Sequence, residues 1–272
     1  MKKKLAGAFL VLCVLLIVAV AFWVSHPFVS ESDLHRHDYS EGIENIVKRS
    51  HQMTDIEWTP QLDIVSWDGD LVYESGTTYT GIPYGRALYA SYVPYDTDLN
   101  GFLEAVNDPN SKMYTDRSSF KKDAPYYSCD CSTFVSYTWG LDKIQSTRKI
   151  PTFTLMISDS SYDQLQVGDC LCRPNGHVVL ITDILYDENE QIRQIEVSEC
   201  TTKQNNDDCC VRTWYGTGYD LSLDDFQTRF LDSRYAIYRF PGRNQVEYTH
   251  CCASPLPGDV CTICGYGLEN AG

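Results

Sequence analysis

The stretch Ser128-Cys129-Asp130-Cys131-Ser132-Thr133-Phe134-Val135-Ser136-Tyr137 carries the strongest signal for the fold. Residues 130–139 are predicted to form a helix, and Gly140 is placed to end it in a left-handed cap. At spacings of three, four and seven residues, the side chains that share one face of this helix are Cys131, Phe134, Val135 and Thr138. We therefore expect Cys131 to face the layer on which the helix packs and not bulk solvent.

The same spacing places Cys131 in the first turn of the predicted helix. Backbone N–H groups and the helix dipole stabilise negative charge there, which favours the reactive thiolate form of a cysteine. The alternative is that Cys131 is half of a disulfide, with Cys129 as the nucleophile or with no nucleophile at all. The helix position and a suitable histidine downstream favour Cys131 as the nucleophile.

Several β-like runs follow the helix. They begin after Val167-Gly168-Asp169 and cover about 169–173, 177–185, 192–200, 210–215 and 234–240. A hairpin turn is predicted at Asp187-Glu188-Asn189-Glu190, between the second and third runs, and a helix at residues 222–231. One helix followed by several antiparallel strands predicts an α+β fold, with the nucleophile helix packed on an antiparallel sheet.

The second predicted strand supplies a base. Period-two alternation places His177 on the same face as Val179 and Ile181. Taken alone, His177 is a satisfied core histidine; together with Cys131 it forms the pair that activates a thiol nucleophile. Asp183 lies on the same face, but too far along the strand to hold the imidazole.

The third predicted strand supplies a carboxylate. Ile195 and Val197 share a face with Glu199, and if that face packs on the helix, Glu199 lies close to His177. A carboxylate in that place fixes the tautomer of the imidazole and favours its charged form. The alternative is that Glu199 is a solvated residue at a strand end.

These residues resemble the NlpC/P60 and CHAP families of papain-like cysteine peptidases and amidases, which cleave bacterial cell-wall peptides. The resemblance covers about residues 76–240. Its matching pieces occur in the order of the family and are Gly81-Ile82-Pro83-Tyr84-Gly85, Asp130-Cys131-Ser132 with Phe134-Val135, Val167-Gly168-Asp169, and Gly176-His177-Val178. The resemblance implies a papain-like core.

The resemblance also implies roles for individual residues. Cys131 becomes the nucleophile, His177 the base, and Glu199 the third polar residue in its CHAP-like form. Tyr84 and Asp130 are candidates for orienting the substrate or the oxyanion, although Tyr84 is also readily explained as a packing residue.

The implied activity is cysteine hydrolysis of amide bonds in a peptidoglycan peptide, as an endopeptidase or an amidase, without a cofactor. Two departures from the family bear on the substrate: Thr133 replaces its usual glycine, and the segment between Tyr84 and Cys131 is longer. A catalytically inactive wall-binding module and an acyl or peptide transferase using the same dyad are the alternatives.

The amino-terminal residues predict export. Lys2, Lys3 and Lys4 precede an unbroken apolar run over residues 5–24, which is long enough to cross a bilayer as a helix. We predict a signal peptide or signal anchor at 1–26, a tether at 27–40 and the catalytic domain at 41–240. Cleavage after Ala19-Val20-Ala21 is the alternative to a retained membrane anchor. The domain is then secreted or membrane-anchored in the bacterial cell envelope.

The chain has 12 cysteines, and this number fits an exported protein. If Cys131 is a free nucleophile and Cys13 lies in the membrane segment, the remaining even number can pair as disulfides in an oxidising compartment. A structural surface protein with every cysteine paired is a further alternative. In the Cys-rich tail, 241–272, a weak zinc site is conceivable at Cys251, Cys252, Cys261 and Cys264, with disulfides or a truncated further domain as alternatives.

Charge narrows the range of partners. The formal net charge is -15, and a surface that acidic repels phosphate backbones, so no nucleic-acid partner is expected. It could favour cationic or mixed-charge substrates. Hydrophobic residues make up 43% of the chain, which is ordinary for a globular protein and excludes general disorder.

Overall fold

The computed structural model describes residues 34–86, 90–116, 124–202, 210–215 and 223–248. They fall into two compact units, residues 34–36 with Leu185–Arg193, and the described residues of 37–184 with those of 194–248. Helices and strands are mixed in the structure, which confirms the predicted α+β class. All candidate site residues that the structure describes belong to the second unit.

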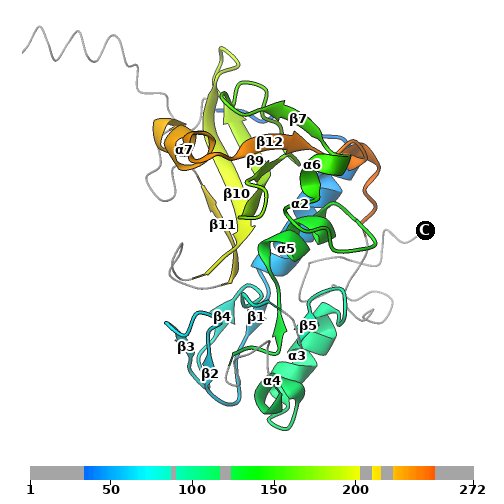
Figure 1. Cartoon of the computed structure of the whole chain (residues 1–272), viewed down its shortest axis with the longest axis vertical. Helices are drawn as coiled ribbons and strands as arrows, with labels where there is room; N and C mark the ends of the chain where they lie inside the picture. Colours follow the sequence, from blue (N-terminus) through cyan, green and yellow to red (C-terminus); the bar gives the residue numbers. More distant parts are fainter. Residues whose placement is uncertain (1–33, 87–89, 117–123, 203–209, 216–222, 249–272) are drawn as a thin grey trace, which may run out of the picture. The chain divides into compact units, whose positions relative to one another are not determined.

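A six-stranded sheet forms the centre of the fold, in the order β11-β10-β9-β8-β12-β7 (Figure 1). Its strands are β7 (Leu155–Ser158), β8 (Cys170–Cys172), β9 (Val178–Tyr186), β10 (Ile192–Cys200), β11 (Val211–Tyr215) and β12 (Ala236–Arg239). Pairing is antiparallel between β8 and both β9 and β12, between β12 and β7, and between β10 and β11. The five strands predicted from the sequence are confirmed, as is the turn at Asp187–Glu190, where Glu190 has φ 59°.

Strand β7 was not predicted. It lies at the edge of the sheet, and its first two residues, Leu155 and Met156, are 57% and 62% exposed. Because neighbouring apolar residues are both exposed there, the strand lacks the alternation that identifies a half-buried strand in a sequence.

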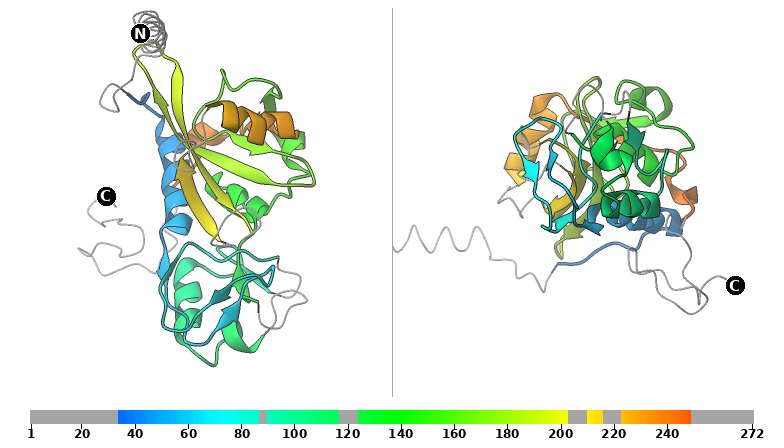
Figure 2. Two further views of the ribbon diagram at one scale, coloured as in Figure 1. Left: turned by 90° about the vertical axis from the view of Figure 1, so that its left-hand side faces the viewer. Right: turned by 90° about the horizontal axis from the view of Figure 1, so that it is seen from below.

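The helices are α2 (Glu41–Thr54), α3 (Leu99–Asn107), α4 (Lys112–Thr115), α5 (Cys131–Thr138), α6 (Ile150–Phe153) and α7 (Leu223–Arg229), with the 3-10 helices η2 (Leu231–Ser233) and η3 (Arg243–Gln245). The apolar spacing of Ile43, Ile46, Val47 and Met53 predicts a helix over about 41–53, which α2 confirms. Helix α5 confirms the helix predicted at 130–139, and Gly140 has the left-handed φ of 67° expected of a cap. Figures 1 and 2 show α2 lying alongside α5. Arg49 Nε of α2 donates to the Tyr137 carbonyl oxygen at 2.7 Å.

The sequence of residues 105–127, with a turn-forming run at Asn107-Asp108-Pro109-Asn110, predicts loops, and this prediction is wrong in part. Helix α3 continues through Asn107, and α4 follows it. Helix α3 begins where Asp98 caps it by accepting the Gly101 N–H at 2.7 Å. Gly101 within the helix weakens the apolar periodicity, which is why the sequence pattern did not reveal it.

Short strands occupy the Tyr- and Gly-rich stretch before the nucleophile helix. Strands β1 (Glu57–Trp58) and β4 (Tyr79–Thr80) pair with each other, as do β2 (Ile64–Val65) and β3 (Val72–Tyr73), while β5 (Ser91–Tyr92) runs parallel to β6 (Tyr127–Ser128). Trp58 anchors this part, with ring centroids 5.1 Å from Tyr73, 5.4 Å from Tyr79 and 5.8 Å from Phe102.

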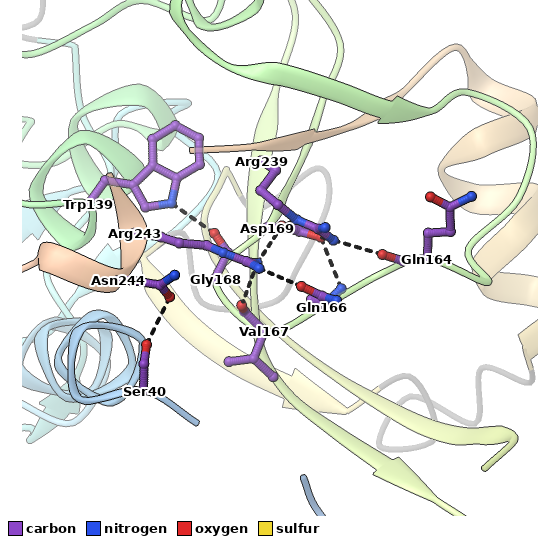
Figure 3. Close-up of polar contacts among 10 residues, drawn as sticks. All are labelled: Ser40, Trp139, Gln164, Gln166, Val167, Gly168, Asp169, Arg239, Arg243 and Asn244. Atoms are coloured by element: carbon purple, nitrogen blue, oxygen red, sulfur yellow. Dashed lines mark hydrogen bonds and ion pairs between the residues drawn. The ribbon is translucent and has the colours of Figure 1, made fainter. Parts of the chain in front are cut away.

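The turn before β8 connects the nucleophile helix to the sheet (Figure 3). Gly168 has φ 85°, and its carbonyl oxygen accepts from Trp139 Nε1, at the end of α5, at 3.0 Å. Asp169 follows, fully buried, and its carboxylate accepts from Arg239 at 2.7 and 2.8 Å and from Arg243 at 3.1 Å. This carboxylate therefore holds together the start of β8, the end of β12 and η3.

Within the described residues, no helix is both long enough and apolar enough to cross a membrane. The predicted signal segment at 1–26 and the first half of the predicted tether, residues 27–33, lie outside those residues.

Candidate active site

Cys131 is the first residue of α5 and is 9% exposed. Asp130 caps the helix: its carboxylate accepts the Thr133 N–H at 2.7 Å and the Ser132 hydroxyl at 2.8 Å. The Tyr92 hydroxyl donates to the other oxygen of this carboxylate at 3.1 Å. Asp130 was a candidate for orienting the substrate or the oxyanion. Its carboxylate instead accepts these three hydrogen bonds and fixes the start of the nucleophile helix.

His177 interacts with both Glu199 and Cys131. Its Nε2 lies 2.7 Å from Glu199 Oε2, and the Cys131 side chain is close enough to raise the pKa of its ring. Since Nε2 is used by the carboxylate, Nδ1 is the ring nitrogen left for the thiol. The side chains of His177 and Glu199 are 18% and 2% exposed, so the pair is largely shielded from water. The structure therefore brings together the three residues predicted as catalytic.

Glu199 is held by two arginines in addition to His177. Arg212 Nη2 lies 3.1 Å from Glu199 Oε1, and Arg229 Nη2 of α7 lies 3.8 Å from the same oxygen. Burial raises the pKa of Glu199, but the hydrogen bond to His177 and the positive charges of His177, Arg212 and Arg229 outweigh it and bring the pKa to about 2. Glu199 is therefore a fixed negative charge at neutral pH.

The charge of His177 follows from the same contacts. Burial lowers the pKa of His177, whereas the negative charge and hydrogen bond of Cys131, together with those of Glu199, raise it to about 10. The imidazole is therefore protonated at neutral pH and lies between a sulfur and a carboxylate. An imidazolium in this place stabilises a thiolate, which is the nucleophilic form of cysteine.

One step of the sequence argument is wrong, although its outcome holds. The face of the sheet that packs on α5 was taken to be that of Ile195, Val197 and Glu199. The hydrophobic core that contains Cys131 instead includes Cys200, Val178 and Leu180. Because strand side chains alternate, Glu199 lies on the opposite face, where its carboxylate pairs with Arg229 of α7.

The position of His177 explains why the site still forms. His177 precedes β9, which begins at Val178, so it lies at the end of the sheet and not within it. From there its ring contacts both the start of α5 and Glu199. Asp183, the other carboxylate on the His177 face, accepts the Tyr39 hydroxyl at 3.5 Å instead.

Tyr84 is brought next to the nucleophile segment. It is 6% exposed and forms a parallel bridge with Cys129, and the Gly85 N–H donates to the Cys129 carbonyl oxygen at 2.8 Å. Burial raises the pKa of Tyr84 well above its usual range, and the negative charge of Cys131 adds to this effect. Tyr84 thus keeps its proton and can donate a hydrogen bond near the thiol.

Four residues around the site were not predicted. Arg212 and Arg229 bind Glu199, Tyr92 binds Asp130, and exposed Arg86 donates from Nε to the Tyr84 hydroxyl at 3.3 Å. For Arg212 the signal was present, because it stands opposite Glu199 in the register of β10 and β11. The other three depend on contacts between segments far apart in the chain.

Among the described cysteines, the free thiols include Cys129, Cys131, Cys170, Cys172 and Cys200. The structure thus has no disulfide among them. The weak zinc candidates Cys251, Cys252, Cys261 and Cys264 lie outside the described residues.

Comparisons of the chain with protein-family models, with curated proteins and with solved structures found no match. The case for a function therefore depends on the residues and their geometry.

Proposed function

We propose that this chain is an exported cysteine hydrolase with a papain-like catalytic core that cleaves an amide bond in peptidoglycan. One observation carries the proposal: His177 is hydrogen-bonded at 2.7 Å to the buried carboxylate of Glu199 and interacts with the side chain of Cys131. This arrangement supplies a nucleophile, a proton donor and a group that orients the donor.

The reaction begins with attack by the Cys131 thiolate on the carbonyl carbon of the amide. Negative charge develops on the carbonyl oxygen, where the N–H of Cys131, at the start of α5, can stabilise it, because the first N–H groups of a helix have no partner within the helix. The Tyr84 hydroxyl is a second donor for this oxygen. His177 then gives its proton to the leaving amine, and the C–N bond breaks to leave a thioester on Cys131.

Hydrolysis of the thioester returns the enzyme to its starting state. His177, now neutral, takes a proton from water as the water attacks the thioester. The acid product leaves, and Cys131 and His177 are again a thiolate and an imidazolium. Glu199 keeps its charge throughout, since its pKa of about 2 lies far below neutral pH. No cofactor is required.

The choice of peptidoglycan depends on the family resemblance around Tyr84, Cys131 and His177 and on the predicted export of the domain. The test is a digest of purified muropeptides with the full chain, analysed by mass spectrometry. We expect cleavage by the wild type and its loss in Cys131→Ala and His177→Ala, with the fold retained by circular dichroism. His51→Gln is the matched control, because His51 pairs with Asp55 on α2 and takes no part in the chemistry.

Three results would contradict the proposal. An active Cys131→Ala variant rules out the nucleophile. Wall binding without cleavage indicates a binding module, and transfer of the acyl group to an added amine in preference to water indicates a transferase.

A further inference from the structure

Two buried thiols that the proposed mechanism does not use lie against each other beside the active site. Cys129 and Cys200 are both 0% exposed, and the Cys200 thiol donates to the Cys129 carbonyl oxygen at 3.2 Å. The Cys129 thiol in turn donates to the Asp130 carbonyl oxygen at 3.3 Å. The two cysteines come from different parts of the chain: Cys129 precedes Asp130, the cap of α5, and Cys200 is the last residue of β10.

The backbone around this pair is held by a common segment. The Val211 N–H, opposite Cys200 in the sheet, donates to the Ile82 carbonyl oxygen at 2.8 Å. Two residues further on, Tyr84 bridges Cys129. Residues 82–84 therefore fix the backbone at both cysteines, and the Cys200 sulfur lies 3.2 Å from the Cys129 carbonyl oxygen.

We infer that Cys129 and Cys200 are a dithiol that closes into a disulfide when the chain folds in the presence of a small-molecule disulfide oxidant such as glutathione disulfide. In the first step one cysteine sulfur, before folding buries it, attacks the oxidant, forms a mixed disulfide and releases one molecule of thiol. The second cysteine sulfur then attacks the mixed disulfide and releases the other. Two protein S–H bonds are replaced by one S–S bond, and the oxidant is reduced to two thiols.

This bond adds to the proposed hydrolase function and does not depend on it. It ties the segment that leads into Cys131 to the strand that carries Glu199, across a separation of 71 residues. Cross-links across long separations constrain the unfolded chain strongly. The bond also uses up both thiols, each of which interacts electrostatically with Cys131. The nucleophile therefore cannot form a disulfide with either of them.

The neighbouring pair Cys170 and Cys172 provides a matched control. Both are buried, but they are two residues apart in β8. The Cα atoms of such residues lie about 6.6 Å apart along a strand. A disulfide needs its Cβ atoms within about 4.5 Å, so this pair stays reduced.

The test is disulfide mapping in full-length Cys131→Ala, isolated without reductant in glutathione redox buffer, alkylated with iodoacetamide in denaturant and digested with trypsin. In this variant the tryptic peptide 123–143 contains Cys129 alone, and 194–203 contains Cys200 alone. We expect these two peptides to be joined, and the peptide 150–193, which stays intact at the Arg173-Pro174 bond, to carry alkyl groups on Cys170 and Cys172. Alkylated Cys129 and Cys200, or a link from either one to another cysteine, overturns the inference.

A stability measurement gives an independent readout. The melting temperature of the chain should fall when reductant is added, and Cys200→Ser should abolish this sensitivity while Cys170→Ser retains it. Sensitivity to reductant that persists in Cys200→Ser contradicts the inference. Because the mapping uses a variant without the nucleophile, a negative result leaves the proposed hydrolase activity untouched, and a lack of activity leaves the disulfide untouched.

Discussion

At the catalytic residues, burial and charge act in opposite directions, and charge prevails. A buried imidazole and a buried carboxylate would each favour its neutral form if isolated. Next to each other, His177 and Glu199 stabilise each other's charged form, and the arginines at Glu199 strengthen the effect on the carboxylate. The reactivity of Cys131 and the stability of the fold are therefore both linked to this pair.

Thiol labelling tests this link at Cys131. Of the described cysteines, Cys131 is 9% exposed, while the other five are 3% exposed or less. We expect iodoacetamide to modify Cys131 first among these six, and His177→Ala to slow the modification at neutral pH by about tenfold or more, because the thiolate loses its cationic partner. Mass mapping over a time course gives the rates. Equal labelling rates in the two proteins would show that His177 does not activate the thiol.

The pH dependence of stability tests the pair itself. Folding raises the pKa of His177 from 6.5 to about 10, so its contribution is complete below pH 6.5 and is lost as the pH rises toward 10. Folding lowers the pKa of Glu199 from 4.5 to about 2, so its contribution is complete above pH 4.5 and is lost as the pH falls toward 2. The difference in unfolding free energy between the wild type and Glu199→Gln should therefore be largest between pH 4.5 and 6.5.

The expected size of that difference is about 3–5 kcal/mol, because the substitution leaves buried positive charges without their partner. Urea unfolding at a series of pH values gives the measurement. A difference that stays constant from pH 3 to pH 9 contradicts the assigned charges.

At the level of elements, the segment before Tyr84 depends on a glycine. Gly81 has φ 84°, and a Cβ atom there would lie 2.0 Å from the Val211 carbonyl oxygen. Gly81→Ala should lower the free energy of unfolding by more than the ~1–3 kcal/mol typical of a strained residue, because the backbone of β11 must also move. The rate of cleavage should fall as well, since Tyr84 and β11 are displaced together.

Gly76→Ala is the matched control for this prediction. Gly76 has a similar φ of 78°, but no atom lies within 4 Å of the added Cβ. Urea unfolding of both variants separates backbone strain from the clash. Equal destabilisation by the two substitutions would show that the contact with β11 has no energetic effect.

The helices and strands also show which parts of the fold can be predicted from sequence patterns. Helix α5 and the five strands from β8 to β12 were predictable, because their apolar periodicity and turn residues are local signals. Alternation gave the residues that share a face with Glu199, but it does not say which face a helix covers, and the face chosen for α5 was wrong. That assignment depends on crossings between segments that no local pattern encodes. Arg229, Tyr92 and Arg86 escaped prediction for the same reason.

At the scale of the whole molecule, the buried Asp169 joins parts of the chain that are far apart in sequence (Figure 3). Asp169→Asn removes the negative charge opposite Arg239 and Arg243, whose side chains are only 19% and 13% exposed. We expect a loss of about 3–5 kcal/mol in unfolding free energy, as for other broken buried ion pairs. Asp163→Asn, at an exposed position, should change stability by less than ~0.5 kcal/mol. Chemical denaturation checks both, and equal effects contradict a structural role for Asp169.

The strand order has a consequence for the timing of folding. The last strand, β12, is inserted between β8 and β7, which are both made before it. A growing chain that has just passed β10 already contains Cys131, His177 and Glu199, yet β8 still has an open edge and β7 has no neighbour in the described sheet. The sheet under the nucleophile helix can close only once residues 236–239 have been added. A ribosome that stalls earlier therefore releases a chain with all three catalytic residues but without the completed sheet that holds them in place.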